Sequence, residues 1–294
     1  MRDGLIVGFD GSTSSRRALE WAGAVARARG VGLQVVTAWK YPAMAGGPLG
    51  PSELSSPEEM ERSVRESAAS IVAELGDELP AEVEIHVGGG PAASVLLRAA
   101  AKVLSPTIVV GARGLGGFEG LLLGSVSQQC LEYATCPVVI VRGDHPPTAG
   151  PDAPPIVAPM VAPIVVGLDG SDGAARAIEW AVDLAVATGG RIVAVHAPGA
   201  GATAPVLDRA RESVQEWCRP IEERGVRYTS RIDAGDARSI LASIADEEDA
   251  ALLVVGSRGL AAVRGLRVGG VAGYLARHAS RSIAVVPPGG GHAP

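Results

Sequence analysis

The stretch LIVGFDGSTSSRRALEWA, residues 5–22, returns in recognisable form as IVVGLDGSDGAARAIEWA at residues 164–181. Each copy starts with a short apolar run, continues through an Asp-Gly-Ser turn signal and ends in apolar residues at helical spacing. This order predicts a buried strand, a turn and an amphipathic helix. Because the same unit occurs twice, the sequence predicts two homologous domains in one chain.

A second landmark repeats farther along each copy. The segment TIVVGARGLGGFEGLLLGS at 107–125 returns as LLVVGSRGLAAVRGLRVGG at 252–270. The first copy is longer between its two landmarks, and its Pro- and Gly-rich stretch 41–57 has no clear counterpart in the second copy. Prolines recur between the copies, which favours a semi-extended spacer. We therefore expect a first domain at 1–142, a Pro-rich linker at 143–162, a second domain at 163–288 and a tail at 289–294.

Short β-branched runs alternate with longer helical patterns through both copies. Strands that are apolar on both faces and separated by helices indicate a parallel sheet between two helical layers. The expected fold is α/β, with two doubly wound domains, each a five-stranded, mostly parallel sheet with helices on both faces. Ligands bind such folds at the carboxyl ends of the strands. We expect first-copy strands near 5–9, 33–38, 83–87, 107–111 and 137–142, first-copy helices near 58–76, 92–104 and 124–134, and second-copy strands near 164–168, 191–196, 227–232, 252–256 and 282–286.

Length and composition limit the function classes. The chain has 294 residues, of which 47% are hydrophobic and 20% charged, as in globular proteins. Its net charge of −6 gives no general attraction to nucleic acids or anionic membranes. Three cysteines without a CxxC pair fit neither a disulfide framework nor a zinc site. No apolar run reaches the roughly 18 residues of a membrane span and no signal peptide is recognised, so we expect a cytoplasmic protein.

A glycine pattern follows an apolar strand in each copy. In the first copy Gly111, Gly114, Gly124 and Ser125 form the spacing G-x2-G-x9-G-S just before a helical segment. Glycines allow positive φ and let the backbone approach a ligand, while N–H groups of such a loop and of a helix N-terminus attract anions. The alternative is a tight strand-to-helix turn. The second copy has Gly256, Gly259 and Gly269, but Gly270 stands where the pattern has Ser.

Asp10 and Asp169 come directly after the first strand of each copy. At that edge of a doubly wound sheet a carboxylate could accept hydrogen bonds from a ribose or an adenine. The alternative is an Asx-turn before a helix that Ser12 or Ser171 caps. Arg113 and Arg258 lie inside the two glycine loops, where they would either contact phosphate or remain solvated.

Groups for covalent or metal catalysis are not assembled in the sequence. The five histidines are scattered without metal-ligand spacing, and neither a GxSxG motif nor a carboxylate pair accompanies the glycine pattern. Any hydrolysis would depend on a bound Mg²⁺ and on positioning, which predicts a slow reaction at best. We therefore expect a protein that binds its ligand rather than an enzyme.

Several of these motifs together resemble the universal stress protein family. They are VGFDGS at 7–12, VVTAW at 35–39, the glycine pattern, and PVVIVR at 137–142. The chain is similar to the tandem form of that family, in which one polypeptide carries two such domains. The resemblance covers nearly the whole chain except the linker and residues 41–57.

The resemblance implies a regulatory, ATP-binding protein of the stress response. Asp10 would meet the adenosine, the backbone around Ala38 the adenine edge, and the glycine pattern with Ser125 the ribose and phosphates. The corresponding second-copy positions are Asp169, Ala197, Gly256, Gly259, Gly269 and Gly270. Because Gly270 lacks a hydroxyl, we expect a tighter site in the first copy than in the second.

Two further expectations concern partners. Family members commonly pair through the last strand, so Pro137–Arg142 and Ser282–Pro287 would join the two copies within one chain, with a homodimer as a further assembly. Two other functions stay open at this point: a slow ATP-hydrolysing enzyme, and a protein-interaction module whose glycine loops are only turns. Trp39 is expected at the pocket mouth, where its fluorescence would report nucleotide binding.

Overall fold

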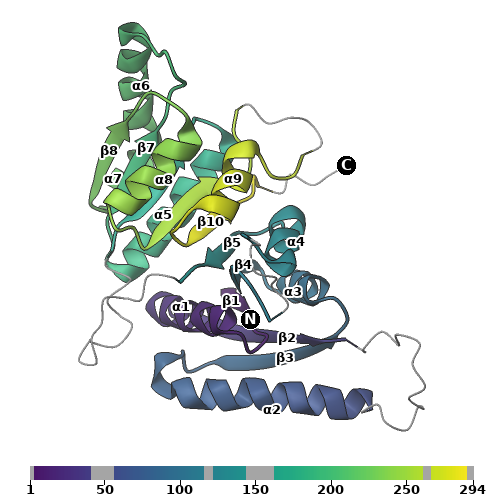
Figure 1. Ribbon diagram of the computed structural model, residues 1–294. Helices are drawn as coiled ribbons and strands as arrows, with labels where there is room; N and C mark the ends of the chain where they lie inside the picture. Colours follow the sequence, from purple (N-terminus) through teal and green to yellow (C-terminus); the bar gives the residue numbers. More distant parts are fainter. Residues whose placement is uncertain (1–2, 41–55, 116–121, 144–161, 261–265, 290–294) are drawn as a thin grey trace.

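The computed structural model describes residues 3–40, 56–115, 122–143, 162–260 and 266–289. In these ranges strands and helices alternate through both halves of the chain (Figure 1). The predicted insertion and most of the predicted linker lie outside the described residues. The first half contains β1 (Asp3–Gly8), α1 (Thr13–Arg29), β2 (Gly32–Trp39), α2 (Pro57–Leu75), a short 3-10 helix η2 (Gly76–Glu78), β3 (Val83–Gly89), α3 (Ala92–Ala100), β4 (Ser105–Gly111), α4 (Ser125–Tyr133) and β5 (Val138–Val141).

The second half repeats this order. It contains β6 (Ile164–Leu168), α5 (Asp172–Thr188), β7 (Ile192–His196), α6 (Ala204–Trp217), α7 (Arg219–Glu223), β8 (Tyr228–Ile232), α8 (Ala237–Glu247), β9 (Leu252–Gly256), α9 (Gly270–His278) and β10 (Ile283–Val286). The predicted strands are present with shifts of one or two residues at several ends. The helix predicted at 92–104 is shorter, because regular α-helix ends at Ala100 and Val103 already donates to the Ala100 carbonyl in a tighter turn.

The two long helices that follow the repeated turn begin and end in the same way. Ser12 and Ser171 accept hydrogen bonds through their side chains from backbone N–H groups three residues on, as N-caps do. Gly30 and Gly189 end these helices in the left-handed conformation, with φ of 63° and 72°. The repeated sequence therefore encodes both ends of α1 and of α5.

All described strands lie in one ten-stranded sheet, in the order β3-β2-β1-β4-β5-β10-β9-β6-β7-β8. Within each half every neighbouring pair is parallel. The halves meet where β10 pairs antiparallel with β5, with Ala284 opposite Val139 (Figure 1). Through this pairing the two halves share one continuous sheet, and both central strands are buried along their whole length.

Successive strand residues point to opposite faces of this sheet and enter two separate cores. Leu5 and Val7 belong to a cluster with α1, α2, α5 and α7, whereas Ile6 belongs to a cluster with α3, α4, α8 and α9. Each cluster contains residues of both halves. The α/β fold class with helices on both faces of parallel sheets is confirmed.

Candidate functional site

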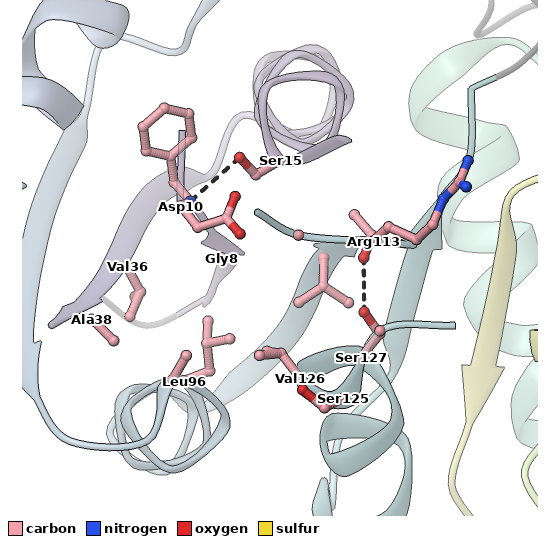
Figure 2. Close-up of a pocket in the computed structure, with 16 residues that line it drawn as sticks. Gly8, Asp10, Ser15, Val36, Ala38, Leu96, Arg113, Ser125, Val126 and Ser127 are labelled. Atoms are coloured by element: carbon pink, nitrogen blue, oxygen red, sulfur yellow. Dashed lines mark hydrogen bonds between the residues drawn. The ribbon is translucent and has the colours of Figure 1, made fainter. Parts of the chain in front are cut away.

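A cavity of about 360 Å³ lies at the carboxyl ends of β1, β2 and β4 (Figure 2). The chain continues from β1 into α1 on one face of the sheet and from β4 into α4 on the other, so the cavity occupies a topological switch point. The structure brings together the first-copy residues that the sequence analysis proposed as nucleotide contacts. Lining the cavity are Asp10, Ala38, Gly111, Arg113, Gly114, Gly124 and Ser125.

The cavity has an apolar side and a polar side. In Figure 2, Val36, Ala38 and Leu96 lie together opposite Asp10, and Val126 borders them at the start of α4. The polar side chains of the lining are Asp10 after β1, Ser15 in the first turn of α1, Arg113 in the glycine loop, and Ser125 and Ser127 in the first turn of α4. An apolar wall with a few placed polar groups is the usual make-up of a small-molecule site, and the volume falls within the roughly 300–1,000 Å³ of such sites.

The Asp10 carboxylate joins the first turn to the glycine loop. One oxygen accepts from the Ser12 backbone N–H at 3.0 Å, which is the Asx-turn that the sequence offered as an alternative. The other oxygen accepts from the Leu115 backbone N–H at 3.1 Å, in the glycine loop. Asp10 therefore makes the turn and also lines the cavity, so the two interpretations describe the same side chain.

The ionisation of Asp10 follows from these contacts. Partial burial raises the pKa of Asp10, but hydrogen bonds from Ser12, Leu115 and Ser15 outweigh it and hold the pKa below the ordinary value of 3.8. The carboxylate is therefore ionised at neutral pH. It contributes stability above its ordinary pKa, and this contribution is lost as the pH falls through the lowered pKa. An ionised carboxylate only accepts hydrogen bonds, so this end of the cavity suits hydroxyl or amino donors.

At two positions of the loop only glycine fits, because atoms of neighbouring elements come too close to leave room for a Cβ. A Cβ on Gly111 would lie 2.6 Å from both the carbonyl carbon and the carbonyl oxygen of Ser14, in the first turn of α1. A Cβ on Gly114 would collide with the carboxylate of Asp10. The second half has the same contacts, between Gly256 and the Gly173 backbone and between Gly259 and Asp169.

Of the two properties of glycine that the sequence analysis named, positive φ is not used at the described loop positions. Gly111, Gly114 and Gly124 are not among the described residues with positive φ, whereas Gly11 and Gly170 in the Asp-Gly-Ser turns have φ of 84° and 79°. The loop needs glycine because backbone and carboxylate atoms of the neighbouring elements leave no space for a Cβ. Left-handed backbone is required in the turn, one residue after each aspartate.

Arg113 and Ser125 take different positions at this site. Both are exposed and line the cavity, but in Figure 2 the Arg113 side chain extends away from Asp10. Ser125 is the first residue of α4. The α4 end of the cavity therefore offers a hydroxyl and the positive end of a nine-residue helix.

The second half keeps the aspartate contacts. Asp169 accepts from the Ser171 and Leu260 backbone N–H groups, each at 3.0 Å, and from the Ser171 hydroxyl at 2.6 Å. Ala197 follows the end of β7, and Arg258 is exposed beside the loop. His196, at the end of β7, is bound through Nδ1 to the Leu168 carbonyl at 2.8 Å and stands edge-on to Trp217.

Three serines near the first site were not singled out from the sequence. Ser14 accepts through its hydroxyl from the Arg113 backbone N–H at 3.3 Å, and the Ser15 hydroxyl accepts from the Asp10 N–H at 3.3 Å. Ser127 donates to the Gly111 carbonyl at 2.7 Å. An alignment of the two copies could have pointed to these serines, because their second-half counterparts are Gly173, Ala174 and Ala272, which have no hydroxyl.

Three further expectations concern Trp39, metal-binding groups and membrane-spanning helices. Trp39 is not among the residues that line this cavity, because its ring packs close to Gly89 on the neighbouring strand. Over the residues that the structure describes, no group of three or more His, Cys, Asp or Glu side chains could hold a metal ion. In the same ranges no helix is long and apolar enough to cross a membrane.

Known proteins match this chain along its length. The model of the universal stress protein family matches residues 1–142 and 160–287. A universal stress protein of Mycolicibacterium smegmatis is 29% identical over 298 residues, with 97% of each chain covered. One of Mycobacterium tuberculosis is 31% identical over 297 residues, covering 96% of this chain and 95% of the relative. The crystal structure of a universal stress protein from Archaeoglobus fulgidus covers 97% of this chain and 98% of its own, with a TM-score of 0.69 and 20% identity, which shows the fold.

Proposed function

Because the chain belongs to the universal stress protein family, we propose that it is a regulatory protein whose first half binds ATP. The observation that carries this proposal is the cavity where Asp10, the apolar wall and the start of α4 meet. Bound nucleotide would change the packing of the domains or the affinity of the protein for a partner.

The polarity of the cavity favours one orientation of the nucleotide. An ionised Asp10 accepts hydrogen bonds from ribose hydroxyls or an amino group and repels phosphate, so the phosphates belong at the opposite, α4 end. There Ser125 and the first-turn N–H groups would donate to phosphate oxygens. The apolar surface of Val36, Ala38 and Leu96 suits the flat face of adenine. Mg²⁺ would be carried by the phosphates, since the described residues offer no metal cluster.

Nucleotide carried by the purified protein tests this proposal. The full chain is denatured, and released adenine nucleotide is quantified per chain by chromatography and mass spectrometry. We expect close to one adenine nucleotide per chain, as ATP or as ADP from slow turnover. If none is released, titration of ATP by calorimetry follows, and no heat together with no ATP-dependent rise in Tm would leave the protein-interaction module as the function. Phosphate release well above background, lost in a Ser125→Ala variant, would favour the slow ATPase.

We further propose that the second half binds ATP more weakly. Gly270 begins α9 where Ser125 begins α4, so one hydroxyl donor to phosphate is missing. A hydrogen bond to a charged group is worth roughly 1.5–3 kcal/mol, or about a tenfold to hundredfold difference in affinity. The sequence offers Arg258, Arg264 and Arg267 as residues that could offset part of this loss.

Replacing Gly270 with serine is expected to raise the ATP affinity of the second half by about tenfold. No atom lies within 4 Å of a Cβ at this position, so the serine enters open space at the helix start. Photolabelling with 8-azido-ATP, followed by peptide mapping of each half, measures the gain. Gly270→Ala is the matched control, because it adds the Cβ without the hydroxyl. Equal labelling of both variants would show that the hydroxyl is not the cause of the asymmetry.

We also propose that the two halves act as an intramolecular pair joined at β5 and β10. The support is the antiparallel pairing of these strands and their complete burial. In this arrangement the proposed domains, 1–142 and 163–288, which the proposed linker at 143–162 connects in the sequence, cover each other's edge strands. A homodimer would then have to form through another surface.

A further inference from the structure

The starts of α1 and α5 differ in sequence, and this difference changes how each helix contacts its glycine loop. In the first half the Ser14 hydroxyl accepts from the Arg113 backbone N–H at 3.3 Å. Its counterpart Gly173 has no side chain, and a Cβ there would lie 2.5 Å from the Arg258 carbonyl oxygen. A real Cβ is not found that close to another heavy atom.

The second loop therefore occupies space that a side chain fills in the first half. The Arg258 carbonyl lies against the start of α5, where the Ser171 hydroxyl stands 3.4 Å from it. In the first half the equivalent place is taken by the Ser14 Cβ and hydroxyl, and the loop meets them with an N–H group. The first peptides of the two glycine loops, at Arg113 and Arg258, therefore pack differently against the starts of their helices.

Ser14 itself does not line the cavity, while Arg113 and Gly114, the residues it holds in place, do. It can affect a ligand only through the loop. Resting on the proposed function, we propose that Ser14 is a positioning residue that keeps the first glycine loop open to phosphates. Gly173 lets the second loop close onto α5, so that the second half prefers a nucleoside without phosphates.

The pair Ser14 and Gly173 is thus a specificity determinant for phosphorylated against unphosphorylated adenosine. The aspartate contacts do not distinguish the halves, because Asp10 and Asp169 bind their loops in the same way. Nor does the apolar wall, since Val36, Ala38 and Leu96 have Val195, Ala197 and Leu241 as counterparts. The difference lies at Arg113 and Arg258. Their Cα atoms lie 3.5 and 3.6 Å from where a Cβ on Gly124 and on Gly269, the N-caps of α4 and α9, would stand, which is the end proposed for the phosphates.

The test compares ATP with adenosine in binding to the full chain by calorimetry, with peptide mapping of 8-azido probes to assign each half. In Ser14→Gly we expect the ATP affinity of the first half to fall at least tenfold, while its adenosine affinity changes less than threefold. Ser14→Ala keeps the Cβ spacer and is expected to lose about threefold for ATP. Thr13→Gly is the matched control, because Thr13 is exposed in the same helical turn and does not contact the loop.

A uniform loss for both ligands in Ser14→Gly, or an unchanged ratio of ATP to adenosine affinity, overturns the proposal. If the wild type binds neither ligand, the proposed function fails instead, so the two failures are distinguishable. Should Ser14→Gly not fold, Gly173→Ala provides the reverse test. Its Cβ pushes the Arg258 carbonyl away, and we expect labelling of the second half by 8-azido-ATP to rise at least threefold relative to 8-azidoadenosine. No rise in that ratio also overturns the proposal.

Discussion

Gly111→Ala is expected to lower the free energy of unfolding by about 3 kcal/mol, at the upper end of the cost of overpacking a buried site. The added Cβ would lie 2.6 Å from the carbonyl group of Ser14. That group is backbone at the start of α1, so it cannot turn aside as a side chain would. Relief would need a shift of α1 against β4, two elements that pack together in the same core. Urea unfolding followed by circular dichroism measures the change.

Gly270→Ala is the control for this variant, since its Cβ meets open space and alanine favours a helix. We expect it to leave the unfolding midpoint unchanged or slightly raised. An equally small effect of Gly111→Ala would mean that α1 and β4 can separate without cost. Variants at Gly111 therefore report on folding before they report on ligand binding.

Asp10→Ala is expected to weaken ATP binding to the first half by about a hundredfold. The carboxylate accepts from the Ser12 and Leu115 backbone N–H groups, and its loss releases the glycine loop from the first turn. It also removes the acceptor proposed for the ribose. Hydrogen bonds to a charged group are worth roughly 1.5–3 kcal/mol each, so even one of them accounts for a tenfold to hundredfold change. Calorimetric titration with ATP measures the loss.

Asp169→Ala makes the same change in the second half, where Asp169 has the same contacts with Ser171 and Leu260. We expect it to leave ATP binding to the first half within about twofold of the wild type. If the two variants have equal effects on the tight site, the assignment of that site to the first half is wrong. Far-ultraviolet circular dichroism of both variants separates lost binding from lost structure.

The repeat determined much of this protein at the level of sequence. Two copies of a strand, turn and helix, each followed by an apolar strand and a glycine pattern, predicted parallel α/β halves and placed Asp10 and Gly111 at the same sheet edge. These predictions held because alternation and spacing are local properties, and because the carboxyl ends of parallel strands necessarily meet. The family model confirms the resemblance to universal stress proteins, because it matches residues 1–142 and 160–287.

Only the tertiary structure decided what each residue does at that edge. The sequence could not distinguish an Asx-turn from a ligand contact for Asp10, because both use the same carboxylate oxygens, and the folded chain supplies Leu115 from 105 residues away. It offered positive φ and close approach to a ligand as reasons for the loop glycines, whereas close packing against Ser14 and Asp10 is the constraint that the structure shows at Gly111 and Gly114. It passed over Ser14 and Ser127, whose partners Arg113 and Gly111 lie 99 and 16 residues away in the sequence. Local patterns determine the elements, but the space left between elements depends on atoms that only folding brings together.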